Sequence, residues 1–359
     1  MSARTFGAMQ MPLRLAVDAR VVTEDTRGVG RYERAILRRL VHRDDVSLTL
    51  LVNGPLAFRH RGRLGRTLGS DNFRVSSHVD DAIDVVWHPA NGTFFPSSRP
   101  SVATIHDAVP FRYPNGDDAA RRHAQEPFLR SARTAARVIA VSQFGADELH
   151  DALAIERERI DVIYHGVEPS FTPGPVDALP AGLAHGSYLL FVGDPIAEPR
   201  KNFAMLYDAF RRAWPNGDGP RLVVAGPRAP ELPGVVAAGE VGDDLLDTKN
   251  TRMRSLYRGA AALALASYHE TFGMPLIEAM ACGTPVIASQ ASCLPEIAGE
   301  AALYAPPDDA GAWSEALRRV TEDTALRVQL RDAGIARAKH FNWDASAQAH
   351  MQLFHSLSA

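Results

Sequence analysis

The feature that most constrains the fold is an alternation of short apolar runs with amphipathic stretches, which stops once and then restarts. Before the break, apolar runs such as 13–18, 46–52 and 101–105 are separated by stretches with helical spacing, for example 29–41 and 119–135. Strands that alternate with helices form a mostly parallel sheet covered by helices on both faces. The sequence therefore predicts an α/β fold.

A segment rich in proline and glycine marks the break. Residues 169–186 contain four prolines and three glycines and show little periodicity, which is typical of a linker. The alternation restarts at 188–192, and 359 residues suit two domains of about 100–200 residues each. We predict doubly wound domains at 1–168 and 187–340, joined by the linker. Because ligands bind beyond the carboxyl ends of such strands, we expect the domains to face each other across a cleft.

Composition excludes several classes of protein. The formal net charge is −3, from 39 basic and 42 acidic side chains, which argues against bulk binding of nucleic acid. No apolar run approaches the roughly 18 residues that cross a membrane, and residues 1–11 lack the apolar core of a signal peptide. The two cysteines, Cys282 and Cys293, could form at most one disulfide. We expect a soluble cytoplasmic protein.

Two carboxylates flank a predicted helix start in the segment 266–286. Glu270 follows a buried strand, and Glu278 is expected in the first turn of a helix that starts at Pro275. Taken alone, Glu270 suits a surface loop and Glu278 a solvated partner of the helix dipole, but their combination favours function. Backbone N–H groups beside a helix start form a ready anion site. Here they belong to Phe272, Gly273 and Met274.

Paired cations follow the first strand of the second predicted domain. That strand is expected to end at Val192, and Arg200 and Lys201 come just before the predicted helix 202–214. Two cations in a strand-to-helix loop suit a diphosphate, because they neutralise charge that develops on a leaving group. The alternative is a basic pair on a solvated loop. Only three of the 39 basic residues are lysines, and Lys201 is one of them.

A glycine pair follows the first strand of the chain. Gly28 and Gly30 lie in Gly-Val-Gly-Arg-Tyr at a predicted helix start, which invites a dinucleotide-binding interpretation. Glu33 occupies the position of the third glycine, and Asn53 stands where a ribose-binding acid belongs, so nicotinamide or flavin binding is not expected. A tight strand-to-helix turn is the alternative explanation of the glycines.

Histidines mark two further strand ends. His106 and Asp107 follow the predicted strand 101–105, and His88 follows the predicted strand 84–87. A lone histidine is more often structural than functional, so these residues carry little weight by themselves.

The segment from Glu270 to Glu278, with seven residues between the two glutamates, resembles the signature of the retaining glycosyltransferases of family 4, which have the GT-B fold. The Gly-Thr-Pro-Val-Ile-Ala-Ser that follows and Leu294-Pro-Glu-Ile continue the likeness, which covers nearly the whole chain. The resemblance implies two Rossmann-like domains, with a nucleotide-sugar on the C-terminal one and the acceptor on the N-terminal one. It also implies that a helix in 341–359 crosses back to the N-terminal domain.

The same resemblance assigns roles on the donor side. Arg200 and Lys201 would hold the diphosphate with help from the amides of 272–274, Glu270 would bind hydroxyls of the donor sugar, and Glu278 would bind the ribose.

On the other side of the expected site, the resemblance places His106 near position 6 of the sugar. The loop with Gly28 and Gly30 would abut the donor phosphate and the acceptor. The acceptor side is expected to include Arg31, His88 and Asp107.

The chain departs from the family pattern at Asp194. Some relatives carry an arginine directly after the strand glycine, so here the diphosphate contacts are expected to rest on Arg200 and Lys201. The sequence contains no Asp-x-Asp triplet and no Cys/His cluster with zinc spacing. We therefore predict an enzyme that uses no metal and no cofactor.

The Gly-x-Gly-Arg-Tyr loop and Pro-Arg-Lys-Asn at 199–202 look most like bacterial mannosyltransferases of surface polysaccharide assembly. This resemblance predicts transfer of mannose from GDP-mannose to a saccharide or lipid-linked saccharide, by a front-face route because no side-chain nucleophile is evident. UDP- and dTDP-sugars are alternative donors. A sugar-nucleotide epimerase and a non-catalytic sugar-nucleotide-binding subunit are alternative functions.

An arginine cluster lies in the first predicted domain. The segment Arg59–Arg66 contains four arginines and no acid. Attraction to anionic lipids would hold the protein peripherally at the inner face of a membrane. A solvated loop is the other interpretation.

Overall fold

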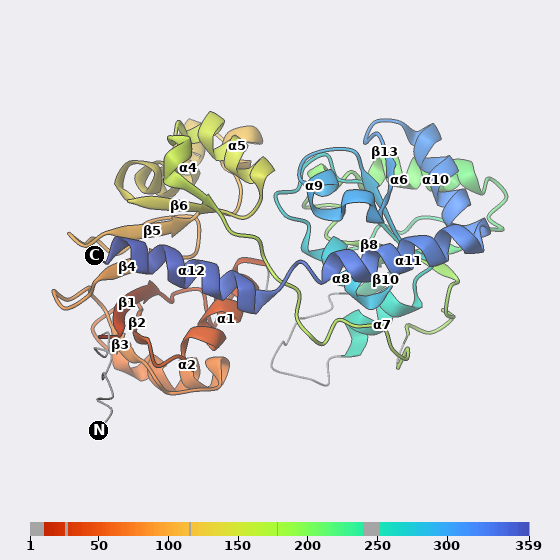
Figure 1. The fold of residues 1–359 in the computed structure, drawn as a ribbon. Helices are drawn as coiled ribbons and strands as arrows, with labels where there is room; N and C mark the ends of the chain where they lie inside the picture. Colours follow the sequence, from red (N-terminus) through yellow and green to blue (C-terminus); the bar gives the residue numbers. More distant parts are fainter. Residues whose placement is uncertain (1–10, 26–27, 115, 178, 240–250, 359) are drawn as a thin grey trace, which may run out of the picture. The chain divides into compact units, whose positions relative to one another are not determined.

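The computed structural model describes residues 11–25, 28–114, 116–177, 179–239 and 251–358 (Figure 1). Residues 1–10, which belong to the segment examined for a signal peptide, lie outside this description. The chain divides into two compact units. Unit 1 comprises Met1–Ala140, Glu148–Ile163 and Ser346–Ala359, and unit 2 comprises Val141–Asp147 and Tyr164–Ala345.

Unit 1 is built on a parallel sheet whose seven described strands run in the order β3-β2-β1-β4-β5-β6-β7. The order reverses at β1, which pairs with β2 on one side and with β4 on the other. Sheets of this kind bind ligands at the carboxyl edge where the order reverses. The strands are β1 (Leu13–Asp18), β2 (Val46–Leu51), β3 (Arg74–Ser76), β4 (Val85–His88), β5 (Ser101–Thr104), β6 (Arg137–Ala140) and β7 (Ile160–Val162).

Helices cover this sheet, and the last helix of the chain packs on its centre. His350 and Phe354 of α12 have ring centroids 5.3 and 5.6 Å from that of Trp87 in β4. Nε2 of His350 lies 2.5 Å from the hydroxyl oxygen of Tyr32 in α1. The helices that lie wholly or mostly in unit 1 are α1 (Gly28–Leu40), α2 (Arg61–Leu68), α3 (Val109–Arg112), α4 (Asp118–Thr134), α5 (Gln143–Leu153) and α12 (Trp343–Leu357), with the 3-10 turns η1 (Ala57–His60) and η2 (Arg157–Arg159).

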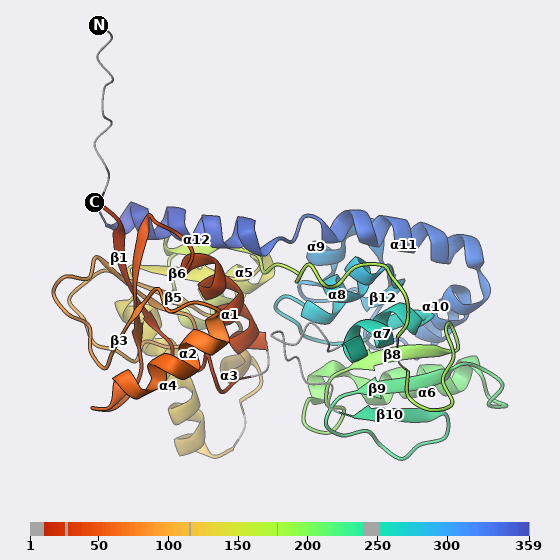
Figure 2. The same cartoon turned by 90° about the horizontal axis from the view of Figure 1, so that it is seen from below.

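Unit 2 repeats the plan with six described strands, all parallel, in the order β10-β9-β8-β11-β12-β13. β8, β9 and β10 lie side by side in Figure 2. The order reverses at β8, which pairs with β9 and β11. The strands are β8 (Tyr188–Val192), β9 (Arg221–Ala225), β10 (Val235–Gly239), β11 (Ala262–Leu265), β12 (Val286–Ser289) and β13 (Leu303–Ala305).

Two apolar cores hold helices against the sheet of unit 2. Trp313 of α10 packs with Phe210 of α6 in one core, and Met280 of α8 packs with Leu256 of α7 in the other. The helices of this unit are α6 (Phe203–Ala213), α7 (Thr251–Gly259), α8 (Met274–Cys282), α9 (Leu294–Ala298), α10 (Ala310–Glu322) and α11 (Thr324–Ala338), with the turns η3 (Pro199–Lys201) and η4 (Gly299–Ala301).

The predicted α/β fold with two doubly wound parallel sheets is confirmed. The interpretation of Arg59–Arg66 as a loop is wrong, because these residues lie in η1 and α2. Leu64 and Leu68 are buried and stand four residues apart, so they form the apolar side that holds α2 against unit 1.

Candidate active site

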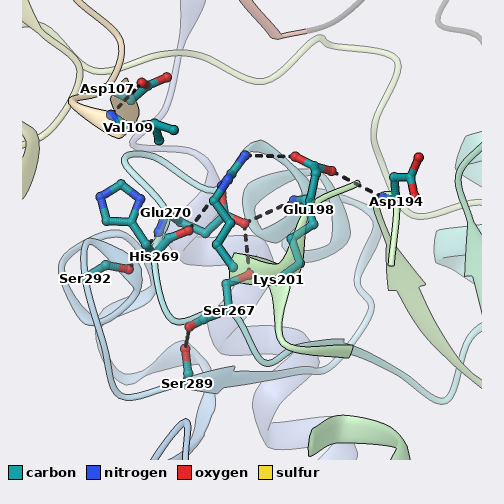
Figure 3. A network of polar contacts seen from close by, with 11 residues as sticks. Asp107, Val109, Asp194, Glu198, Lys201, Ser267, His269, Glu270, Ser289 and Ser292 are labelled. Carbon is teal, nitrogen blue, oxygen red and sulfur yellow. Dashed lines mark hydrogen bonds and ion pairs between the residues drawn. The ribbon is translucent and has the colours of Figure 1, made fainter. Parts of the chain in front are cut away.

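A group of paired charges in unit 2 lies at the carboxyl ends of β8 and β11. Lys201 ends η3, which follows β8, and Glu270 lies in the loop that follows β11. Because these two parallel strands are neighbours, their carboxyl ends meet at one edge of the sheet. Nζ of Lys201 lies 3.1 Å from Oε1 of Glu270, which also accepts a 2.9 Å hydrogen bond from Ser267 (Figure 3).

The pair is buried and carries charge. The side chains of Lys201 and Glu270 are 9% and 10% exposed, and Nη1 of Arg200 lies 3.7 Å from Oε2 of Glu270. Burial alone would raise the pKa of Glu270, but the nearby charges of Lys201 and Arg200 outweigh burial and hold the pKa below its usual value. Glu270 is therefore an ionised, paired carboxylate, and the interpretation as a surface-loop charge is wrong.

Local backbone geometry explains how Lys201 reaches this position. Asn202 has a left-handed backbone (φ 59°), and its side-chain amide donates to the carbonyl oxygens of Ala266 (3.1 Å) and Pro307 (2.6 Å). These bonds tie the end of η3 to the end of β11. Gly193 has φ 141°, and a Cβ there would lie 2.3 Å from Cδ of Lys201, so only glycine leaves room for the lysine stem.

Arg200 is oriented by partners on two sides. Its Nη2 donates to Oε1 of Glu198 at 2.8 Å, and its Nη1 donates to the carbonyl oxygen of His269 at 3.2 Å. The guanidinium is therefore fixed next to Glu270, which rules out the interpretation of a basic pair on a solvated loop. Glu198 was not among the predicted site residues. A glutamate two residues before an arginine gives no sequence signal that separates it from an ordinary loop charge.

Glu278 differs from its prediction in position and in environment. The helix α8 begins at Met274, one residue before Pro275, so Glu278 lies in the second turn and not in the first. It is 2% exposed, and Oε2 accepts a 2.9 Å hydrogen bond from the hydroxyl of Tyr257 in α7. Glu278 is thus a buried, hydrogen-bonded carboxylate and not a solvated partner of the helix dipole. No pattern in the sequence points to Tyr257 as a partner of Glu278.

The amides of Phe272, Gly273 and Met274 lie at the N-terminus of α8, where helix N–H groups lack intrahelical partners. Gly273 caps this helix with a left-handed backbone (φ 80°), a conformation that favours glycine. The ring of Phe272 packs 4.7 Å from the ring of His165 and 5.7 Å from that of Phe341. The loop before α8 is thereby anchored by aromatic packing.

The glycine pair of unit 1 lies in the first turn of α1. A Cβ on Gly30 would lie 2.0 Å from the carbonyl oxygen of Asp25, whereas a Cβ on Gly28 would have nothing within 4 Å. Glycine is therefore required sterically at Gly30 but not at Gly28. Arg31, which follows, is 8% exposed.

His106 is held at the end of β5 as a neutral imidazole. Its Nε2 lies 2.8 Å from the carbonyl oxygen of Pro89, and its ring packs edge-on at 4.8 Å against Tyr32. Burial lowers the pKa of His106, so the ring is uncharged at neutral pH. Oδ1 of Asp107 accepts the backbone N–H of Val109 at 3.0 Å, which starts α3.

His88 lies in a buried polar cluster at the reversal point of the unit 1 sheet. Its Nδ1 is 4.0 Å from Oδ2 of Asp18 at the end of β1, and Glu33 of α1 is also fully buried. Burial opposes the ionisation of Asp18, but His88 and Arg20 outweigh it and leave the pKa of Asp18 below its usual value. Burial raises the pKa of Glu33 well above its usual value. Asp18 has no sequence signal that marks it as part of a site, and Glu33 is recognisable in the sequence only because it replaces the third glycine of a dinucleotide motif.

In the described part of the chain, no group of three or more histidine, cysteine, aspartate or glutamate side chains is arranged to hold a metal ion. Metal independence stays a prediction. No described helix combines the length and the apolar character needed to cross a bilayer.

Family models match both halves of the chain. The model "Glycosyltransferase Family 4" matches residues 13–171, and "Glycosyl transferases group 1" matches residues 186–323. The chain is 28% identical over 365 residues to the O-antigen chain mannosyltransferase B of Escherichia coli, which covers 88% of this chain and 93% of that protein. It is 29% identical over 298 residues to a D-inositol 3-phosphate glycosyltransferase of Actinosynnema mirum, with 76% and 71% covered.

Among solved structures, a sucrose-phosphate synthase from Thermosynechococcus elongatus matches with a TM-score of 0.68 at 21% identity, over 97% of this chain and 99% of that one. This likeness extends over both units and supports the GT-B fold. The two matched models, the paired Rossmann-like sheets and the relatives that match most of the chain agree, and the chain belongs to the family 4 glycosyltransferases, the glycosyl transferases group 1.

Proposed function

We propose that this glycosyltransferase moves mannose from GDP-mannose to a hydroxyl of a saccharide or lipid-linked saccharide, with retention of configuration and without a metal or cofactor. The observation that carries the proposal is the buried Lys201–Glu270 pair, with Arg200 beside it, at the carboxyl edge of unit 2. The likeness to an O-antigen chain mannosyltransferase over most of both chains supports the choice of sugar.

The geometry suits a reaction in which a diphosphate leaves. When the bond from the sugar to the diphosphate breaks, negative charge grows on the departing oxygen. Lys201 and Arg200 supply two positive charges at one place, and the N-terminus of α8 adds backbone N–H groups with a favourable dipole. These cations are positioned before the donor arrives, so little reorganisation is needed during the reaction.

Glu270 is assigned to binding and not to nucleophilic attack. Its Oε1 already takes hydrogen bonds from Lys201 and Ser267, which weakens it as a nucleophile but leaves it a good acceptor for sugar hydroxyls. With no other nucleophile assigned, the acceptor hydroxyl attacks from the face on which the diphosphate leaves. Glu278 is assigned to the ribose hydroxyls, and His106, as a neutral imidazole, to the donor sugar.

A thermal-shift screen tests the donor. GDP-mannose, UDP-sugars and dTDP-sugars are added separately, and a nucleotide that binds the folded protein raises Tm by mass action. We expect GDP-mannose to give the largest rise, to yield free GDP when an acceptor is supplied, and to do so equally with EDTA present. Formation of an isomeric nucleotide-sugar without acceptor would indicate an epimerase. Failure of every nucleotide-sugar to bind would contradict the proposal.

The acceptor is tested in the same assay. The likeness to a D-inositol 3-phosphate glycosyltransferase makes an inositol phosphate the second class of acceptor to supply, beside mannosylated saccharides. We expect sugar transfer to the saccharide, and transfer to inositol 3-phosphate alone would replace this acceptor assignment.

The proposal also includes a peripheral contact with anionic membranes at the cytoplasmic face. Phe58 is 64% exposed and Leu56 is 46% exposed, beside the exposed arginines of η1 and α2. An apolar group flanked by cations suits the surface of an anionic bilayer. Co-sedimentation with anionic vesicles at low salt is expected, and Phe58→Ser should weaken it.

A further inference from the structure

Two carboxylates in the loop that follows β8 each bind an arginine. Glu198 binds Arg200, which belongs to the site described above. Four residues earlier, Oδ2 of Asp194 lies 2.8 Å from both Nε and Nη2 of Arg228, a residue that follows β9. Arg228 has no role in the proposed function so far, although it is fixed by the same loop.

Asp194 is a rigid anchor for this arginine. Its Oδ1 accepts the backbone N–H groups of Ile196 and Ala197, both at 2.9 Å, and its own N–H donates to Oε2 of Glu198 at 3.2 Å. One carboxylate oxygen thus shapes the loop while the other binds Arg228. The carboxylate that binds the guanidinium of Arg228 is therefore itself held by the backbone of the loop.

Close backbone contacts bring the segment that carries Arg228 against the loop that carries Lys201 and Arg200. A Cβ on Gly226 would lie 2.0 Å from the carbonyl oxygen of Gly193, so the chain after β9 runs directly against the loop. The stem of Lys201 packs on the same Gly193. Lys201 and Arg228 therefore both contact the short segment Gly193–Asp194.

The charges at this segment favour an anionic ligand. The carboxylate of Asp194 alone would repel a diphosphate, but the guanidinium of Arg228 neutralises the charge of Asp194. A guanidinium has five N–H donors, and Asp194 takes two of them through a single oxygen. The side chain of Arg228 is 50% exposed, so the remaining donors are open to a ligand. Arginine binds phosphate well through several N–H groups at once.

We propose that Arg228 is a third diphosphate-binding cation of this enzyme and that Asp194 is the positioning residue that holds it. The inference rests on the proposed function, because it assumes that a nucleoside diphosphate binds beside Lys201. It assigns the cationic side of the donor site to three residues from two loops, those after β8 and β9.

Calorimetry with GDP tests this role. We expect Arg228→Gln to weaken GDP binding at least tenfold, since one charged contact is lost and the charge of Asp194 is exposed. The matched control is Arg212→Gln, because Arg212 forms a comparable 2.8 Å ion pair with Asp208 on the outer surface of α6. The control should bind GDP within twofold of the wild type, and far-UV circular dichroism confirms that both variants are folded.

A double variant tests the part played by Asp194. Asp194→Asn keeps an oxygen that accepts the two loop amides but loses the charge. Added to Arg228→Gln, it should recover part of the lost GDP affinity, because it removes the uncompensated carboxylate; a merely structural role would give no recovery. If the wild type binds GDP and Arg228→Gln binds it equally well, the inference is overturned. If the wild type binds no nucleoside diphosphate, the proposed function itself fails.

Discussion

At the scale of single residues, the site depends on carboxylates that are buried and paired. Glu278 shows the pattern, since it is 2% exposed and accepts a hydrogen bond from Tyr257 of a neighbouring helix. A buried carboxylate that loses a donor is costly, because its desolvation is no longer compensated. The orientation of Glu278 is therefore set partly by Tyr257, and a ligand that binds Glu278 will sense the loss of the tyrosine hydroxyl.

Tyr257→Phe tests that orientation. We expect the free energy of unfolding to fall by about 1 kcal/mol, and GDP affinity measured by calorimetry to fall about fivefold. Tyr304→Phe is the control, because Tyr304 donates a 2.6 Å hydrogen bond to the carbonyl oxygen of Gly299, outside the site. The control should lose similar stability and keep its GDP affinity. Equal GDP affinities in the two variants would remove Glu278 from the donor site.

At the scale of elements, α12 is held to unit 1 by a histidine that must stay neutral. Nδ1 of His350 bonds to the carbonyl oxygen of Ser346 at 2.7 Å, and Nε2 lies 2.5 Å from the hydroxyl of Tyr32. Nδ1 therefore carries the proton, and Nε2 accepts the tyrosine hydrogen. Complete burial lowers the pKa of His350 to about 4, and the unfolded chain binds a proton near the ordinary value of about 6.5.

This shift predicts acid sensitivity of folding. Because the pKa of His350 is lower in the folded chain than in the unfolded chain, the neutral ring stabilises the fold above pH 6.5. This contribution is lost as the pH falls from 6.5 toward 4. The loss amounts to about 2 kcal/mol by pH 5. Urea unfolding at pH 7 and pH 5 measures it, and His350→Gln should show a smaller difference between the two pH values. His355→Gln, on the same helix, should lose as much stability between pH 7 and pH 5 as the wild type does. If His350→Gln also loses as much stability as the wild type, this explanation is wrong.

Helices and strands with strong apolar periodicity could be predicted from the sequence, whereas short or polar ones could not. The predicted strand 188–192 has the bounds that the structure gives, and the predicted helix 119–135 differs from α4 by one residue at each end. β13 has only three residues and α7 is rich in arginine, so neither produces an apolar pattern long enough to read. Their formation depends on packing against elements distant in the sequence.

The same limit applies to the site. Glu270, Lys201 and Arg200 could be predicted because they stand at strand ends in a recognisable motif, and the structure brings them together. The bond between Asp194 and Arg228 joins residues 34 positions apart and leaves no local pattern. Glu278 was located, but its burial depends on α7, which the sequence did not reveal.

At the scale of the whole molecule, one plan of strands is used twice. Each unit is a parallel sheet whose strand order reverses once, at β1 in unit 1 and at β8 in unit 2. Polar side chains gather at the carboxyl edge at both reversals, but their charges differ. Unit 2 has Lys201 and Arg200 beside Glu270, whereas unit 1 has a neutral His106 and a buried cluster around Asp18. The proposed binding of the donor diphosphate to unit 2 rests on this difference in charge.

If Lys201 binds the diphosphate of the donor, as proposed, then Lys201→Met should bind GDP more weakly than the wild type, and calorimetry measures this affinity. Methionine keeps the apolar stem that packs on Gly193 and removes the charge. The control is Lys339→Met, at another of the three lysines, which is exposed at the end of α11. Both variants are checked for folding by circular dichroism. We expect the GDP affinity to fall at least tenfold, about 1.4 kcal/mol, in Lys201→Met and to stay unchanged in the control. Wild-type GDP affinity in folded Lys201→Met would exclude Lys201 from the diphosphate site.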